Sequence, residues 1–162
     1  MATCGLDYTV KTWDVRKLKP SKSKSIAIQN VYRSINSAFF SPTGKYLLTT
    51  TMKDTLDIIT DAHMLKGKIE PEHSIRHNNQ TGRWLTTFHS KWHPTSAEDL
   101  FISGSMKKPR TMQIFRGNDG EIVRDINGLS LTAVVSRCCF HPSDSELIVA
   151  GGNSSGRVTL AR

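Results

Sequence analysis

Short apolar segments alternate with polar turns along this chain, and one order of segments recurs. An apolar strand is followed by a turn that contains proline, a second strand that ends in small residues, a hairpin and a third strand. The turn prolines Pro42, Pro94 and Pro142 are 52 and 48 residues apart. This spacing is typical of a repeated sheet of about 40–45 residues with insertions in its loops. The predicted strands are 35–40, 46–50 and 56–60, then one ending at Trp92 followed by 100–104 and 112–115, and then one ending at Phe140 followed by 147–151 and 158–160.

The first sixteen residues contain the sharpest form of the pattern. Residues 2–6 and 10–15 read as two strands joined by a bend at residues 7–8, and the second strand carries the dipeptide Trp13-Asp14. This segment resembles the last two strands of a WD repeat. The resemblance implies an all-β fold, a WD-repeat β-propeller in which four-stranded sheets are arranged around an axis. The residues at the position of Trp13 in the later copies are Ile59, Phe115 and Ala161.

The repeats divide the whole chain into parts of one propeller. Residues 1–24 form the end of a blade and a basic loop, and 25–65, 66–120 and 121–162 are successive repeats. These are about three and a half blades of a probable seven, so we expect a partial propeller that is the C-terminal part of a larger one. A partial array should leave one strand edge and one apolar sheet face without a neighbour.

Charge and cysteine content narrow the functional classes. The formal net charge of +8 favours a polyanionic partner such as nucleic acid, although many basic domains only carry a solvated positive face. Three cysteines do not form a disulfide framework and favour a reducing compartment. We find no signal-peptide pattern and no apolar run of about 20 residues, so neither secretion nor membrane insertion is indicated.

The sequence gives no support for catalysis or for a cofactor. Cys138 and Cys139 are neighbours in a predicted strand, so their side chains point to opposite faces and cannot share one metal ion. The glycine-containing run 151–156 lacks the Lys-Ser/Thr pair and the following helix of a phosphate-binding loop. We therefore expect a protein that is not an enzyme and that has no cofactor, metal site or small-molecule substrate.

The candidate nucleic-acid residues lie in connections that a propeller gathers on one face. These connections are the hairpins between second and third strands, and the long loop 77–84 that joins an outer strand near residues 73–76 to the next sheet. Side chains that are far apart in sequence then form a phosphate-binding rim. The predicted DNA contacts are Lys53, Arg76, Arg83, Trp84, Lys107, Lys108, Arg110 and Arg157.

Trp84 has two interpretations. It is either a core aromatic at the start of an inner strand or part of an exposed tip, Gly82-Arg83-Trp84. In the second case the indole would stack on a base or wedge beside it, and Arg83 would hold a phosphate or a base edge.

Arg16 belongs to the opposite face, which carries the proline-containing turns. The segment Trp13-Asp14-Val15-Arg16 resembles the docking motif of WD-repeat substrate receptors for the cullin 4 ubiquitin ligase. The resemblance implies that Trp13, Asp14 and Arg16 bind the adaptor subunit of that ligase, with the guanidinium fork satisfying two acceptors. The same tetrapeptide also occurs in WD repeats that do not dock. The basic residues that follow, up to Lys24, read as a solvated loop.

Four longer runs carry a more specific resemblance. The segments 34–42, 77–86, 104–110 and 150–156 resemble the C-terminal blades of the WD repeat-containing protein 76 family and its fungal relatives. Residues 13–16, the turn 40–42 and the turn 92–94 also resemble, more distantly, damage-specific DNA-binding protein 2. In that relative a Phe-Gln-His tip enters the lesion, and its place corresponds to Gly82-Arg83-Trp84. No residue of the triplet is retained, so insertion of the same kind is not expected.

The family resemblance implies a nuclear, chromatin-associated propeller of the DNA damage response that binds DNA and serves as a receptor for the cullin 4 ligase. The alternative from another class is a protein-interaction scaffold whose basic face captures histone tails or other peptides. The sequence leaves both functions open.

Overall fold

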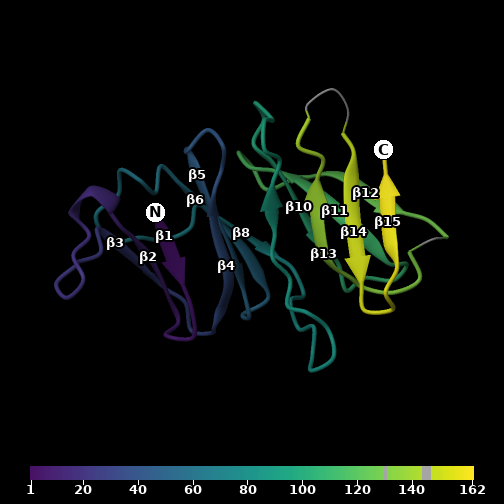
Figure 1. Cartoon of the computed structure of the whole chain (residues 1–162), viewed down its shortest axis with the longest axis horizontal. Helices are drawn as coiled ribbons and strands as arrows, with labels where there is room; N and C mark the ends of the chain where they lie inside the picture. Colours follow the sequence, from purple (N-terminus) through teal and green to yellow (C-terminus); the bar gives the residue numbers. More distant parts are fainter. Residues whose placement is uncertain (130, 144–146) are drawn as a thin grey trace.

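The computed structural model describes residues 1–129, 131–143 and 147–162, and within them it is built from strands (Figure 1). The first sheet has the order β1-β2-β3-β7 and the second has the order β4-β5-β6-β8. Their strands are β1 (Ala2–Cys4), β2 (Thr9–Thr12), β3 (Ala27–Asn30) and β7 (Gly67–Lys68), and β4 (Ile35–Phe40), β5 (Tyr46–Thr51), β6 (Thr55–Thr60) and β8 (His73–Arg76).

The third sheet has the order β12-β11-β10-β9 and the fourth has the order β13-β14-β15. Figure 1 shows the sheets following one another in chain order, with the last sheet in front of the third, as expected for the blades of a partial propeller. The all-β WD-repeat fold predicted from the sequence is therefore confirmed. The strands are β9 (Lys91–Trp92), β10 (Leu100–Gly104), β11 (Thr111–Arg116) and β12 (Ile122–Asn127), and β13 (Val135–Phe140), β14 (Val149–Asn153) and β15 (Val158–Ala161).

The chain leaves the first three sheets along β3, β8 and β12 and enters the following sheets along β4, β9 and β13. Between β6 and β8 it returns to the first sheet as β7, which pairs with β3. The predicted outer strand near residues 73–76 is present as β8, which pairs with β6. A repeat of the sequence thus contributes its outer strand to one sheet and its other strands to the following sheet. This overlap joins neighbouring sheets through the chain itself.

The strand predicted for residues 10–15 is wrong at its end. β2 stops at Thr12, and residues Val15–Lys17 form a single 3-10 turn, η1. The carboxylate of Asp14 accepts a hydrogen bond from the backbone N–H of Arg16, which caps this turn and competes with strand pairing.

The edges of the array are covered unequally. The outer edge of the first sheet is partly protected, because β7 pairs in parallel with β3 at Ala27 and Ile28. In the last sheet, Val158 and Leu160 of β15 are each 72% exposed. The expected apolar side chains without a neighbour are therefore found on β15.

Among the described residues, the core consists of three apolar clusters, each between two neighbouring sheets. In the central cluster, Phe101 and Phe115 stack with ring centroids 5.0 Å apart, and Trp92 meets the edge of Phe101 at 5.2 Å. The indole N–H of Trp92 also donates to the carbonyl of Phe39 at 2.7 Å, which ties the third sheet to the second. The array is held together by contacts across sheets as well as by pairing within them.

Two neighbouring sheets approach each other closely at Gly104. A Cβ atom at this position would lie 1.7 Å from the main-chain oxygen of Val135, so no side chain fits without moving one backbone from the other. We predict that Gly104→Ala lowers the free energy of unfolding by about 3 kcal/mol or more. Denaturant unfolding of the intact protein measures this loss. Gly152→Ala is the matched control, since a Cβ there meets no atom within 4 Å, and its change should stay within about 0.5 kcal/mol. Equal effects of the two substitutions would contradict the close-packing argument.

Candidate nucleic-acid interface

The loop from His77 to Trp84 is anchored on the β5–β6 hairpin. The backbone N–H of His77 donates to the carbonyl of Asp54 at 3.0 Å. The side-chain amide of Gln80 donates to the carbonyl of Met52 at 2.9 Å and to Oδ1 of Asp54 at 3.1 Å. In Figure 1 the loop between β8 and β9 extends at the lower edge of the molecule, where the β1–β2 and β14–β15 hairpins also lie. The Trp84 loop and these two hairpins therefore end on one side of the molecule, and the DNA contact predicted for that side stays a prediction.

Asn79 makes the base of this loop rigid. Its side chain is fully buried, and its Nδ2 donates to the carbonyls of Thr51 and Thr55 at 2.9 and 3.1 Å. These bonds orient the amide so that Oδ1 accepts from Nδ1 of His77 at 2.7 Å. Sequence reasoning missed this role of Asn79 and His77, because both lie in a polar stretch that reads as an exposed loop. In the sequence, the residue that could have indicated this buried role is Asp54, an aspartate in the preceding hairpin. Its Oδ1 accepts a hydrogen bond from the backbone N–H of Asn79 at 2.8 Å.

The tip beyond this base is exposed. Gly82 has φ of +68°, a backbone conformation that glycine adopts without strain. Trp84 is 85% exposed, and the guanidinium of Arg83 lies 5.4 Å from the centroid of its indole ring. The interpretation of Trp84 as a core aromatic is wrong, and an aromatic side chain paired with a cation faces solvent here.

The predicted cations differ in whether another group of the protein already engages them. Arg76 and Lys107 line the same pocket of about 340 Å³ beside His77. In residues 1–129, 131–143 and 147–162, Arg76, Arg83, Lys107 and Lys108 have no acidic partner within ion-pair distance. Their charge is open to an external anion.

The other three predicted cations are engaged within the protein. Lys53 lies 3.6 Å from Oδ2 of Asp57, a fully buried carboxylate. Arg110 donates to the carbonyl of Met106 at 2.8 Å, which fixes the β10–β11 hairpin. Arg157 of the β14–β15 hairpin donates to the hydroxyl of Thr132 at 3.4 Å. Lys53 is thus the least suited of the set to hold a phosphate, because it already balances a buried charge.

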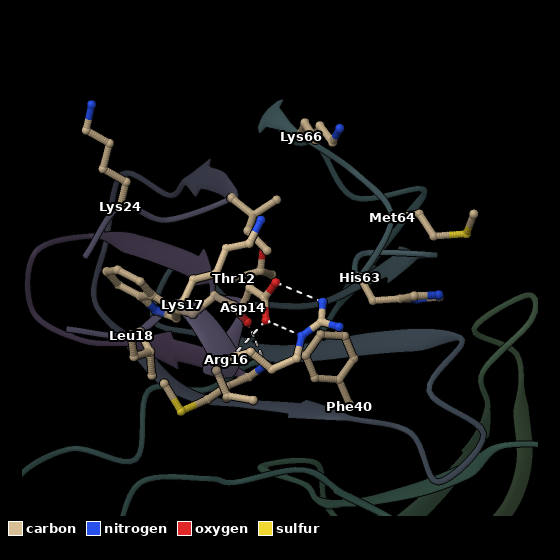
Figure 2. Close-up of a pocket in the computed structure, with 14 residues that line it drawn as sticks. Thr12, Asp14, Arg16, Lys17, Leu18, Lys24, Phe40, His63, Met64 and Lys66 are labelled. Carbon is tan, nitrogen blue, oxygen red and sulfur yellow. Dashed lines mark hydrogen bonds and ion pairs between the residues drawn. The ribbon is translucent and has the colours of Figure 1, made fainter. Parts of the chain in front are cut away.

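The opposite face carries Arg16. Its Nε and one terminal nitrogen donate to the two carboxylate oxygens of Asp14, each at 2.9 Å (Figure 2). These bonds hold the pKa of Asp14 at about 2, while the Arg16 side chain stays 84% exposed. Trp13 is half-buried, and its indole N–H donates to the hydroxyl of Thr3 at 2.8 Å.

A pocket of about 440 Å³ surrounds this pair. Figure 2 shows Phe40, His63 and Met64 on the side of Arg16 that faces the following sheet. Met64 is 68% exposed. The surface combines a fixed cation with apolar side chains, which suits a protein partner better than a small molecule.

The described residues contain no group of three His, Cys, Asp or Glu side chains that would hold a metal ion. Cys138 is buried, which raises the pKa of its thiol to about 12, whereas Cys139 is exposed on the other side of β13. The described part of the chain also has no helix with the length and apolarity needed to cross a membrane.

The buried base of the loop predicts a pH dependence of stability. Burial lowers the pKa of His77 below its usual value of 6.5. As the pH falls through about 6.5, the unfolded chain binds a proton that the folded chain resists, so the free energy of unfolding decreases. Denaturant unfolding of the intact protein between pH of about 7 and 5 should show this loss, and His77→Gln should reduce it. His89→Gln measures how much of this loss comes from His89, because burial also lowers the pKa of His89. A His77→Gln variant that follows the wild-type curve would contradict the assignment.

Comparison with known proteins finds relatives that are similar to nearly the whole chain. No family model matches the chain. WD repeat-containing protein 76 of Mus musculus is 38% identical over 157 residues, which is 96% of this chain and 24% of the relative. The DNA damage-binding protein CMR1 of Chaetomium globosum is 32% identical over 99% of this chain and 32% of the relative. DNA damage-binding protein 2 of Gallus gallus is 30% identical over 91% of this chain and 30% of the relative.

The chain thus spans about a quarter to a third of the length of these curated relatives. The similarity covers 91% to 99% of this chain. The chain is a homologue of WD repeat-containing protein 76, and it is also similar to two relatives whose names describe DNA damage-binding proteins.

Proposed function

We propose that the chain is part of a nuclear, non-enzymatic protein that binds DNA in the response to DNA damage. The observation that carries the proposal is the exposed pair Arg83 and Trp84. Arg76, Lys107 and Lys108 lie in neighbouring connections and have no acidic partner among the residues that the structure describes. Two of the relatives carry names that describe DNA damage-binding proteins, which supports DNA as the polyanion.

Each part of this face has a separate task in the proposal. Arg76, Lys107 and Lys108 neutralise phosphates and release the counterions condensed on DNA, which gives affinity without sequence preference. The indole of Trp84 offers a flat surface to a base that is unstacked or poorly paired. Arg83 remains close to the indole and holds the adjacent phosphate. DNA whose bases are already partly unstacked then costs less to bind than regular duplex.

The double variant Lys107→Ala/Lys108→Ala tests the phosphate contacts. We expect weaker binding to all DNA sequences and a salt dependence whose slope falls by about two, because two phosphate contacts are lost. Fluorescence anisotropy of labelled DNA, titrated over a range of salt concentrations, measures both effects. Lys22→Ala/Lys24→Ala is the matched control, since it removes the same charge from the basic loop on the Arg16 face. If both variants change the slope equally, net charge rather than this face binds DNA.

Titration of a histone-tail peptide against DNA separates this proposal from a peptide-binding scaffold. A basic tail should bind weakly to a surface whose exposed cations would repel it. Tighter binding of the peptide than of DNA would overturn the proposal in favour of the scaffold.

The Arg16 face supports a second part of the function, docking on the adaptor subunit of the cullin 4 ubiquitin ligase. The specific observation is the guanidinium of Arg16, which Asp14 orients while most of its surface remains exposed beside Phe40 and Met64. A guanidinium held in place loses little conformational entropy when it meets the acceptors of a partner.

Arg16→Ala tests the docking surface. We expect loss of the adaptor from affinity-purified protein, with DNA affinity unchanged because the two faces are separate. Lys17→Ala removes the neighbouring cation of the same turn and should keep the adaptor bound. Retention of the adaptor by Arg16→Ala would remove the docking proposal and leave DNA binding untouched.

A further inference from the structure

The loop one sheet before the Trp84 loop also carries an exposed aromatic side chain beside an arginine. It joins β3 to β4, as the Trp84 loop joins β8 to β9. Tyr32 in this loop is 91% exposed and is followed by Arg33, which is also exposed. An aromatic side chain with a neighbouring arginine thus occurs in two successive loops of the same kind.

Backbone hydrogen bonds hold the Tyr32 loop between two hairpins of the basic face. The N–H of Val31 donates to the carbonyl of Tyr8 at 2.8 Å, and the N–H of Met52 donates to the carbonyl of Ser34 at 2.9 Å. The same β5–β6 hairpin anchors Gln80 on its other side. The two aromatic loops are therefore fixed to one common hairpin, and their spacing is set by the fold.

A polar pocket lies between the two loops. It has a volume of about 600 Å³ and is lined by Arg33, Lys53, Gln80 and the ring of Tyr8, among others. Tyr8 is 52% exposed, so it adds a further aromatic surface at the first hairpin.

The charges around this pocket favour an anionic ligand. Asp7 is paired with Lys11 at 2.7 Å, and Oδ1 of Asp54 accepts from both Asn79 and Gln80. In the ranges that the structure describes, Arg33 has no acidic partner within ion-pair distance. Asp54 keeps its negative charge at the wall of the pocket, so the attraction for an anionic ligand comes from the guanidinium of Arg33, which remains open.

We infer that Tyr32 and Arg33 form a second contact for DNA with unpaired bases, one sheet away from Arg83 and Trp84. Tyr32 stacks on an unpaired base, and Arg33 holds a phosphate of the same strand at the mouth of the pocket. Stacking tolerates any base, because every base has an aromatic face. Two tips fixed on one hairpin then select a strand whose bases are exposed over several nucleotides, since paired bases offer no free face. This inference rests on the proposed DNA-binding function and specifies the form of DNA.

A comparison of two labelled DNA duplexes tests the inference. The two duplexes are identical except that one contains a short single-stranded gap, and the affinity of the intact protein is measured for each. The wild type should prefer the gapped DNA. Tyr32→Ala should weaken binding to the gapped DNA about tenfold, with an unchanged salt slope, because an uncharged stacking contact is lost. Tyr32→Phe should restore the preference, since it keeps the ring. Arg33→Ala should lower the salt slope by about 0.7, the value for one phosphate of a single strand.

Met64→Ala is the matched control, because it removes an exposed side chain from the opposite face. The Lys107→Ala/Lys108→Ala variant separates this inference from the function on which it rests. If that variant weakens binding while Tyr32→Ala binds gapped DNA as the wild type does, the inference is overturned and the DNA-binding function stands. If the wild type binds neither DNA, both are overturned.

Discussion

Close packing between neighbouring sheets is the constraint on which the rest of the structure depends. At Gly104 the backbone of β10 approaches Val135 so closely that no side chain fits, and at Gly151 a Cβ atom would meet the Met112 side chain at 2.5 Å. Interiors packed at this density allow little sliding. The strands of neighbouring sheets therefore end at similar levels, and the hairpins that join them lie on the same side of the molecule. This brings together cations that are far apart in the sequence.

The same packing explains how an exposed aromatic tip is kept in place. The loop that carries Trp84 begins as a buried polar segment, in which Asn79 satisfies two carbonyls of the β5–β6 hairpin and holds the ring of His77. The ring of His77 in turn lies against Phe88, with centroids 5.6 Å apart. The loop thus loses its conformational entropy when the protein folds and not when a ligand binds, so the tip is preorganised for binding.

The sequence was sufficient for features that depend on local pattern. The alternation of apolar residues and the turn prolines predicted the strands around Leu47, Phe101 and Val149, because burial on both sides of a sheet constrains those positions directly. It failed where a single side chain overrides the pattern, as Asp14 does when it ends β2 and forms η1. It also missed the partner of Lys53 and the exposure of Tyr32, because both depend on which segments the packing of sheets brings together.

The exposed cations of the two faces differ in whether an acid pairs with them. The structure between the faces decides whether the two proposed partners affect each other's binding. Asp14 and Arg16 neutralise each other while the guanidinium stays exposed. On the other face, Lys107 and Lys108 have no such acid among the residues that the structure describes. The strands between the faces are paired within their sheets, and the described residues show one packing rather than an element with two alternative packings that would connect the faces. Coupling between two sites requires such an element or a shared change in order. DNA and a ligase adaptor would therefore bind to opposite faces of the sheets independently, and recruitment would follow from simultaneous occupancy rather than from an allosteric change.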